Sequence, residues 1–232
     1  MVYVTGDMHG DPARLSAPAL RRLTREDTLL VCGDFGFIWD GGAAEQKLLR
    51  RLGRQKYTIA FLDGRHENFS LLAEYPVVEW HGGRAQQINE RVYHLLRGEI
   101  YTIEEHTYFT FGGGESDDRD YREPGVSWWP EEMPTEQEMR HALDVLAAHG
   151  NQVDCILTHV PSLKASARLN PRQTADGVSL FLGGIENTVT CEKWFFGSLH
   201  WDKAISQHRR AVFEEVLPVW PAPEGARHAR RR

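Results

Sequence analysis

Cysteine is scarce in this chain of 232 residues, and its three residues, Cys32, Cys155 and Cys191, lie far apart. Neither a disulfide framework nor a zinc knuckle is compatible with an odd number of widely spaced cysteines. Two of the three fall inside apolar runs typical of strands. We therefore expect buried thiols in a reducing compartment.

Long apolar runs are also missing, since no stretch approaches the roughly 20 residues that a membrane-spanning helix needs. The first residues, MVYVTGDMHG, have the pattern of a strand, without a basic or apolar leader. These two features predict a cytoplasmic protein that does not associate with a membrane.

Positive charge is in deficit, because 27 Lys and Arg stand against 33 Asp and Glu, a formal net charge of −6. Residues 221–232 contain four Arg and one Glu, so residues 1–220 carry −9. An acidic body argues against binding nucleic acid through its phosphates. The Pro, Gly and Arg content of residues 221–232 predicts a disordered basic tail.

Hydrophobic residues, at 41%, suffice for a sizeable core. Apolar runs of strand length, each followed by turn residues, predict strands at 2–7, 28–34, 57–64, 99–103, 108–114, 153–159, 193–200 and 211–220. Helical patterns lie between them at about 12–23, 43–54, 67–73 and 135–150. The last helix begins with a capping box made by Thr135 and Glu138. One α/β domain over residues 1–220 is the simplest interpretation.

The segment 112–135 has no regular pattern and is unusually long for a plain connection. Loops of this length commonly cover a site, so we expect a functional role for it. Within it, Trp128 and Trp129 are interpreted as packing residues rather than as a substrate wall.

Five predicted strands end in polar residues that could bind a metal or transfer a proton. These residues are Asp7 with His9, Asp34, Arg65 with His66, His159, and Ser198 with His200. If Asp7 and Asp34 meet at about 4 Å, they repel by about 4 kcal/mol at an effective dielectric near 20, and a cation is needed. Carboxylates with neutral imidazoles suit a divalent transition metal such as Mn, Fe, Zn, Co or Ni.

The segments GDMHG, GDFG, GRHE, THVP and GSLH, in this order from residue 6 to residue 200, resemble the five motifs of calcineurin-like metallophosphoesterases. The segment GVSWWPEEMP resembles small bacterial members. The resemblance implies two stacked mixed β-sheets flanked by helices, with an active site that bridges two metals at the strand ends. It also implies that the first metal binds Asp7, His9 and His200, that Asp34 bridges to the second metal, and that His159 binds the second metal.

Two positions depart from the family pattern, and both concern the second metal. Arg65 stands where the family has asparagine, and Ser198 stands where it has histidine. We therefore expect a single metal, with the permanent charge of Arg65 replacing the other one. The planar Arg65 fork suits pairing with Asp34 and gripping a phosphate or carboxylate oxygen. His66 is then predicted to donate a proton, and Glu67 and Asn68 to begin a helix.

The expected activity is that of a metal-dependent hydrolase of a phosphomonoester or a phosphodiester, in which one metal activates water. A mononuclear hydrolase of a carbonyl ester or amide is an alternative, because one metal is enough for that chemistry. A catalytically silent scaffold is another alternative, although the retention of the four first-metal ligands and His66 argues against it. The sequence leaves the metal, the oligomeric state and the substrate open.

Overall fold

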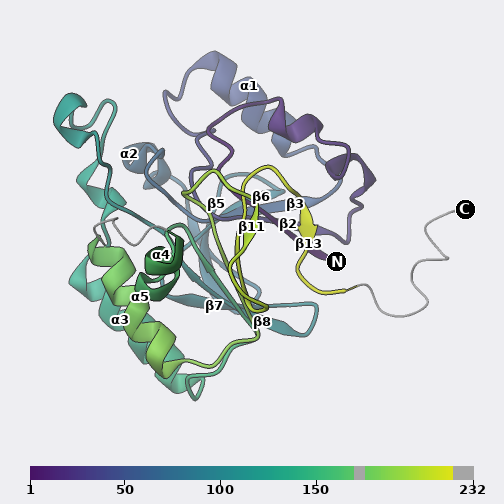
Figure 1. Cartoon of the computed structure of the whole chain (residues 1–232). Helices are drawn as coiled ribbons and strands as arrows, with labels where there is room; N and C mark the ends of the chain where they lie inside the picture. Colours follow the sequence, from purple (N-terminus) through teal and green to yellow (C-terminus); the bar gives the residue numbers. More distant parts are fainter. Residues whose placement is uncertain (170–175, 222–232) are drawn as a thin grey trace, which may run out of the picture.

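The structure, a computed structural model, describes residues 1–169 and 176–221. Two mixed β-sheets stack on each other, and helices cover their outer faces (Figure 1). This is the predicted α/β sandwich. The predicted tail, apart from Pro221, lies outside the described residues.

The first sheet is parallel at its centre, with Tyr3 opposite Leu29 and Leu29 opposite Ile59. Antiparallel strands complete both edges. Its seven strands are, in order, β13 (Leu217–Pro218), β1 (Val2–Thr5), β2 (Thr28–Val31), β3 (Thr58–Phe61), β6 (Val92–Leu95), β5 (Gly83–Gln87) and β4 (Val77–Trp80).

The second sheet also has a parallel centre, in which Ile156 lies opposite both Trp194 and Phe109. Its six strands are, in order, β11 (Lys203–Ala204), β12 (Arg209–Ala211), β10 (Lys193–Phe196), β9 (Cys155–Thr158), β8 (His106–Phe111) and β7 (Glu99–Ile103). Because both sheets are parallel at the centre, the carboxyl ends of several strands reach the same end of the sandwich.

Helices and short 3-10 turns cover the two sheets separately, as Figure 1 shows. Over the first sheet lie α1 (Ala43–Leu52), α2 (Phe69–Leu72) and turns at Arg14–Ser16 and Leu20–Arg22. Over the second sheet lie α3 (Glu136–Ala148), α4 (Leu163–Leu169) and α5 (Gly177–Thr188). Two more turns, Arg119–Tyr121 and Pro130–Glu132, interrupt the long loop, which projects beside α2. None of the described helices is long and apolar enough to cross a membrane.

The interior consists of three apolar layers. The central layer lies between the sheets, where Val4 and Leu30 of the first sheet pack with Tyr108 and Leu157 of the second. Cys32 and Cys155 are buried in this layer, as expected, and burial raises the pKa of both thiols. The two outer layers join each sheet to its helices.

Two sequence predictions were wrong. The helix expected over 12–23 is two 3-10 turns, because Pro18 lacks the N–H that a continuous helix needs. The strand expected over 211–220 is divided between the two sheets, β12 ending at Ala211 and β13 beginning at Leu217. The carboxylate of Asp202 accepts hydrogen bonds from three backbone N–H groups of the connecting turn. The chain therefore crosses from one sheet to the other at that turn.

The capping box of α3 is confirmed, since the Thr135 side chain accepts from Glu138 N and the Glu138 side chain accepts from Thr135 N. Strands β4, β5 and β6, and helices α4 and α5, have no counterpart among the sequence predictions. Their apolar patterns are short and broken by polar residues, so neither the helical period of about 3.6 residues nor the strand period of about 2 can be recognised.

A buried ion pair is formed by Asp63, which lies two residues before Arg65 in the chain after β3. The Asp63 carboxylate accepts from Arg97 Nη2 at 2.5 Å and Nε at 2.9 Å, and it lies 3.2 Å from His94 Nε2. Burial alone would raise the pKa of Asp63, but the charge of Arg97 and the His94 contact lower it below its ordinary value. Asp63 is thus held as a carboxylate inside the protein.

We predict that Arg97→Ala destabilises the protein by about 3–5 kcal/mol, because it leaves the Asp63 carboxylate buried without its partner. Urea unfolding at neutral pH measures the change in the free energy of unfolding. The control is Arg140→Ala, which removes an exposed ion pair with Glu136 and is expected to cost less than about 0.5 kcal/mol. Equal losses in the two variants would contradict the structural role of the buried pair.

Candidate metal centre

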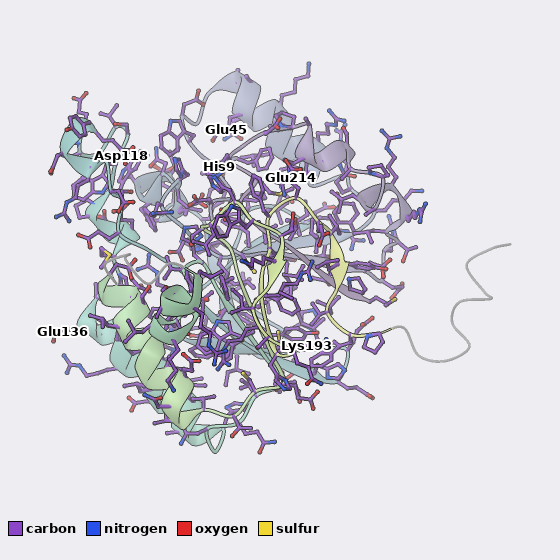
Figure 2. All side chains as sticks on the ribbon, in the orientation of Figure 1. His9, Glu45, Asp118, Glu136, Lys193 and Glu214 are labelled. Atoms are coloured by element: carbon purple, nitrogen blue, oxygen red, sulfur yellow. The ribbon has the colours of Figure 1, made fainter. Side chains whose placement is uncertain are left out.

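The ends of five strands bring the predicted site residues together at one end of the sandwich. Residues Asp7, Asp34 and His66 follow β1, β2 and β3 of the first sheet, whereas His159 and His200 follow β9 and β10 of the second. In Figure 2 His9 lies between the labelled Asp118, on the long loop, and Glu214. The site therefore spans the seam between the two sheets.

Asp7 is completely buried and faces two histidines. Its Oδ2 lies 3.3 Å from His200 Nε2, and its Oδ1 lies 3.7 Å from His159 Nδ1. Oδ1 also accepts from Ser198 N at 3.0 Å. The Asp7 carboxylate raises the pKa of His200 above its ordinary value.

Asp34 is the most heavily hydrogen-bonded carboxylate of the site. Its Oδ1 accepts from Arg65 N at 2.5 Å and His66 N at 3.0 Å, and it lies 3.4 Å from His159 Nε2. Its Oδ2 lies 3.0 Å from His66 Nδ1. Burial alone would raise the pKa of Asp34, but His159, His66 and Arg65 together lower it well below its usual range. Asp34 is therefore a carboxylate at every ordinary pH.

His9 lies between Asp34 and His200, the histidine next to Asp7. Its Nε2 lies 2.9 Å from His200 Nε2, and its Nδ1 lies 4.0 Å from Asp34 Oδ2. Burial, the leading cause, lowers the pKa of His9. A neutral His9 presents a lone pair, which is the form in which histidine binds a metal.

The arrangement fits a divalent metal ion. Asp7 Oδ2 and His159 Nε2 are buried and have no hydrogen-bond partner within residues 1–169 and 176–221. Unpartnered buried polar atoms are unfavourable, and a metal would satisfy them. Ligand atoms come within 4.8 Å of one another in three overlapping groups, which are Asp7 with His9 and His200, His9 with Asp34 and His66, and Asp7 with Asp34 and His159.

The backbone at the site is held in an unusual conformation. Four residues other than glycine have positive φ there: His9 (49°), Asp34 (45°), Ser198 (62°) and His200 (52°). This region is disfavoured for L-residues, and such residues cluster at functional sites. Gly33 has φ +87°, and a Cβ there would lie 2.1 Å from His159 Nδ1, so only glycine fits.

Arg65 does not make the expected side-chain pair with Asp34 among the described contacts, because its guanidinium turns to backbone carbonyls instead. It donates to Glu115 O and to Ser198 O, each at 3.4 Å. Only the backbone N–H of Arg65 binds Asp34. The side chain lines a cavity of about 240 Å³ that Ser198 also lines.

Three side chains that the sequence did not single out contact the predicted site. Arg14 donates through Nη1 to Asp7 O at 2.6 Å and fixes the first strand end. Arg122, from the long loop, has its Nη2 3.4 Å from His66 Nε2. Trp39 lines a cavity of about 340 Å³ together with His9 and His66. No local sequence signal distinguishes these residues from ordinary surface arginines or core aromatics.

Of the two tryptophans of the loop, Trp129 is a packing residue as predicted, whereas Trp128 is only half-buried. Trp129 is buried against Trp39, with ring centroids 5.4 Å apart, and its Nε1 donates to Ser70 Oγ at 3.0 Å. Trp129 thereby joins the loop to α2 and supports Trp39 at the edge of the site.

Glu67 has a different place from the one expected. The N-cap of α2 is Asn68, whose side chain accepts from Leu71 N. Glu67 is completely buried and accepts from Phe35 N at 2.7 Å and from Gly36 N at 3.3 Å. Burial first, and the Asp34 charge second, raise the pKa of Glu67 well above its ordinary value.

Comparison with known protein families now identifies the class. The chain matches the model of the calcineurin-like phosphoesterase family over residues 1–184, and it belongs to that family. The match ends before Ser198 and His200, which the fold nevertheless brings beside Asp7. Family membership indicates a metal-dependent phosphoester hydrolase that acts on a small molecule. A comparison with curated proteins found no match.

We predict that Glu67→Gln changes the pH dependence of stability in chelator-treated protein. Folded Glu67 keeps its proton above about pH 4.3, where the unfolded carboxyl has lost it. The folded state then binds more protons, so this group makes the free energy of unfolding fall as pH rises, by up to about 1.4 kcal/mol per pH unit. Glutamine removes this term, and the variant should gain stability relative to the wild type between pH 5 and pH 8.

Urea unfolding across this pH range measures the effect of Glu67→Gln. Glu136→Gln, on the exposed surface of α3, is the matched control and should track the wild type. A difference between Glu67→Gln and the wild type that stays constant with pH would mean that the buried carboxyl titrates normally.

Proposed function

We propose that this protein hydrolyses phosphoesters with one divalent transition metal, bound by Asp7, His9, Asp34 and His200, and with Arg65 in place of a second metal. The observation that carries the proposal is the contact between the two positions that depart from the family motifs. Arg65 Nη2 donates to Ser198 O at 3.4 Å. A fixed cation thus lies beside the position where the family places a ligand of the second metal.

The four proposed ligands offer carboxylate oxygen and imidazole nitrogen, a donor set suited to Mn, Fe, Zn, Co or Ni. A bound ion of this kind would supply Lewis-acid polarisation of the phosphoryl oxygen and would lower the pKa of a water molecule. Asp7 and Asp34 are buried, so bulk water would compete little with such an ion for their carboxylates. Backbone N–H groups of Arg65, His66 and Ser198 hold those carboxylates in place.

Arg65 would act as a fixed positive charge. Its guanidinium lowers the pKa of Asp34 and, by repulsion, opposes protonation of His200. A second metal would have to enter next to this charge with only Asp34 and His159 remaining from the family's ligands. His159 is completely buried and would instead hold the Asp7 and Asp34 carboxylates in position through its two ring nitrogens.

His66 is proposed as the proton donor to the leaving oxygen. Its Nδ1 faces Asp34 Oδ2 at 3.0 Å, which fixes the ring and directs Nε2 away from the carboxylate. The ring is more than one third exposed, at 37%, and lines the 340 Å³ cavity. A donor oriented by a buried carboxylate and open to the cavity has the geometry of general acid catalysis.

Two alternatives remain as outcomes of the tests. A single metal is sufficient for hydrolysis of a carbonyl ester or an amide. A silent scaffold without a metal would still bury the Asp7 and Asp34 carboxylates side by side, with His159 next to both. Buried carboxylates are unfavourable without a compensating cation. The preserved ligand geometry therefore favours an active enzyme.

We predict about one transition-metal ion per chain in protein purified without chelator, and close to two in the double variant Arg65→Asn with Ser198→His. The double variant removes the competing cation and restores an amide and an imidazole, so a second ion can bind beside Asp34 and His159. Elemental analysis counts the metal, and hydrolysis of a generic aryl phosphodiester should appear or rise, because two ions clamp both the attacking and leaving oxygens.

Each single variant is the matched control for the double variant. Ser198→His leaves Arg65 to repel the second ion, and Arg65→Asn leaves the ligand set incomplete, so both should bind less metal than the pair. Two ions per chain in the wild type would overturn the single-metal proposal.

We predict that His66→Ala lowers turnover by about 10²–10⁴-fold while metal content stays unchanged, the loss typical of a missing general acid. Turnover of an aryl phosphomonoester and elemental analysis of the same preparation measure both quantities. His149→Ala, at the exposed C-cap of α3, is the control. Loss of metal from His66→Ala would show that His66 is a ligand, as its place near His9 and Asp34 allows.

A further inference from the structure

The long loop carries an arginine into the proposed active site. Arg122 follows the turn Arg119–Tyr121, and its Nη2 lies 3.4 Å from His66 Nε2. His66 Nδ1 in turn faces Asp34 Oδ2 at 3.0 Å. Only one imidazole ring therefore separates the Arg122 guanidinium from a proposed metal ligand. The side chain is only 18% exposed, although both neighbours in sequence are exposed.

The contacts that hold Arg122 are weak enough to be exchanged. Its Nη2 pairs with Asp118 at 2.8 Å, but the Asp118 side chain is 54% exposed and belongs to the same loop. Its Nη1 donates to Ser127 O at a long 3.4 Å. The Asp118 end of this ion pair is exposed to solvent, which weakens the pairing, so a doubly charged ligand next to His66 could replace Asp118.

The other arginine of the turn has a different environment. Arg119 is 49% exposed and pairs with Glu115 at 2.6 Å, with no described contact to the histidines. One loop thus carries two arginines, of which one reaches the site. This difference makes Arg119 a matched control for Arg122.

We propose that Arg122 binds the terminal oxygens of the substrate and that the substrate class is a phosphomonoester; this rests on the function proposed above. Arg65 and Arg122 contact different residues of the site, Arg65 contacting Ser198 and Arg122 contacting His66. Two guanidinium groups and one divalent ion match the dianion that a phosphomonoester becomes above about pH 6. A phosphodiester has only one negative charge and offers no terminal dianion for the second guanidinium. Planar guanidinium groups bind such oxygens in pairs of hydrogen bonds.

The same contact explains how the long loop takes part in recognition. Trp129 anchors the loop through Trp39 and Ser70, at the edge of the cavity that His66 lines. Arg122 therefore extends from a segment fixed at one end, over the histidine proposed to protonate the leaving group.

The test compares Arg122→Ala, Arg122→Lys, Asp118→Asn and Arg119→Ala in metal-loaded protein. Calorimetry measures binding of inorganic phosphate, and kinetics are measured with 4-nitrophenyl phosphate and bis(4-nitrophenyl) phosphate. Arg122→Ala should weaken phosphate binding about 10- to 100-fold, as expected for the loss of a charge-assisted hydrogen bond. It should lower kcat/KM for the monoester about ten-fold more than for the diester, with lysine restoring part of the loss. Arg119→Ala should stay within about two-fold of the wild type.

Asp118→Asn separates ligand binding from a purely structural role of Arg122. If Arg122 only braces the loop, removal of its ion-pair partner should reduce phosphate binding as Arg122→Ala does. If Arg122 binds phosphate, Asp118→Asn should leave binding unchanged or tighter, because a competing carboxylate is gone. Loss in both variants would overturn the proposal.

The outcomes also distinguish this inference from the proposed function. Phosphate binding that depends on Arg122, in a protein that hydrolyses neither ester, would support the subsite and refute the hydrolase. Hydrolysis that is indifferent to Arg122→Ala would support the hydrolase and refute the subsite. An equal loss on both esters, or activity on the diester alone, would refute the assignment of a phosphomonoester.

Discussion

The structure of the site depends on the burial of two carboxylates, Asp7 and Asp34, at the point where the two sheets meet. Both are 1% exposed or less, and completely buried His159 lies between them. Carboxylates are unfavourable in a protein interior unless positive charge and hydrogen bonds compensate them. Backbone N–H groups, histidines and Arg65 supply part of this compensation, and a metal bound at the proposed site would satisfy the remaining unpartnered atoms, Asp7 Oδ2 and His159 Nε2.

This constraint accounts for the local backbone. His9, Asp34, Ser198 and His200 at the strand ends adopt positive φ, and Gly33 allows His159 to approach the chain closely. Such conformations are unfavourable in isolation, and the packed sheets on both sides hold them. The two sheets therefore position the residues proposed as ligands, while the long loop brings Arg122 to His66.

Charge is distributed unevenly around the centre. In the interior next to the site, Arg97 neutralises Asp63, and burial raises the pKa of Glu67. The Arg65 guanidinium, by contrast, makes long hydrogen bonds to two backbone carbonyls. The Arg122 guanidinium pairs with the exposed carboxylate of Asp118. The Asp63–Arg97 pair is thus fixed by burial, whereas Arg65 and Arg122 have the looser contacts that the proposed binding of an anion requires. This difference separates groups that maintain the fold from groups suited to recognition.

The sequence by itself determined the central strands, the capped helix α3, the family and the set of polar strand ends, because alternating apolar runs and local motifs are encoded within short segments. It could not determine where the Arg65 guanidinium points, how Glu67 is buried, or that 211–220 divides between two sheets. Those features depend on contacts between residues distant in the chain, such as Arg65 with Ser198 and Arg122 with His66. Only the tertiary structure decided them. Side-chain direction and burial follow from the way in which the two sheets and the long loop pack around the buried carboxylates of Asp7 and Asp34.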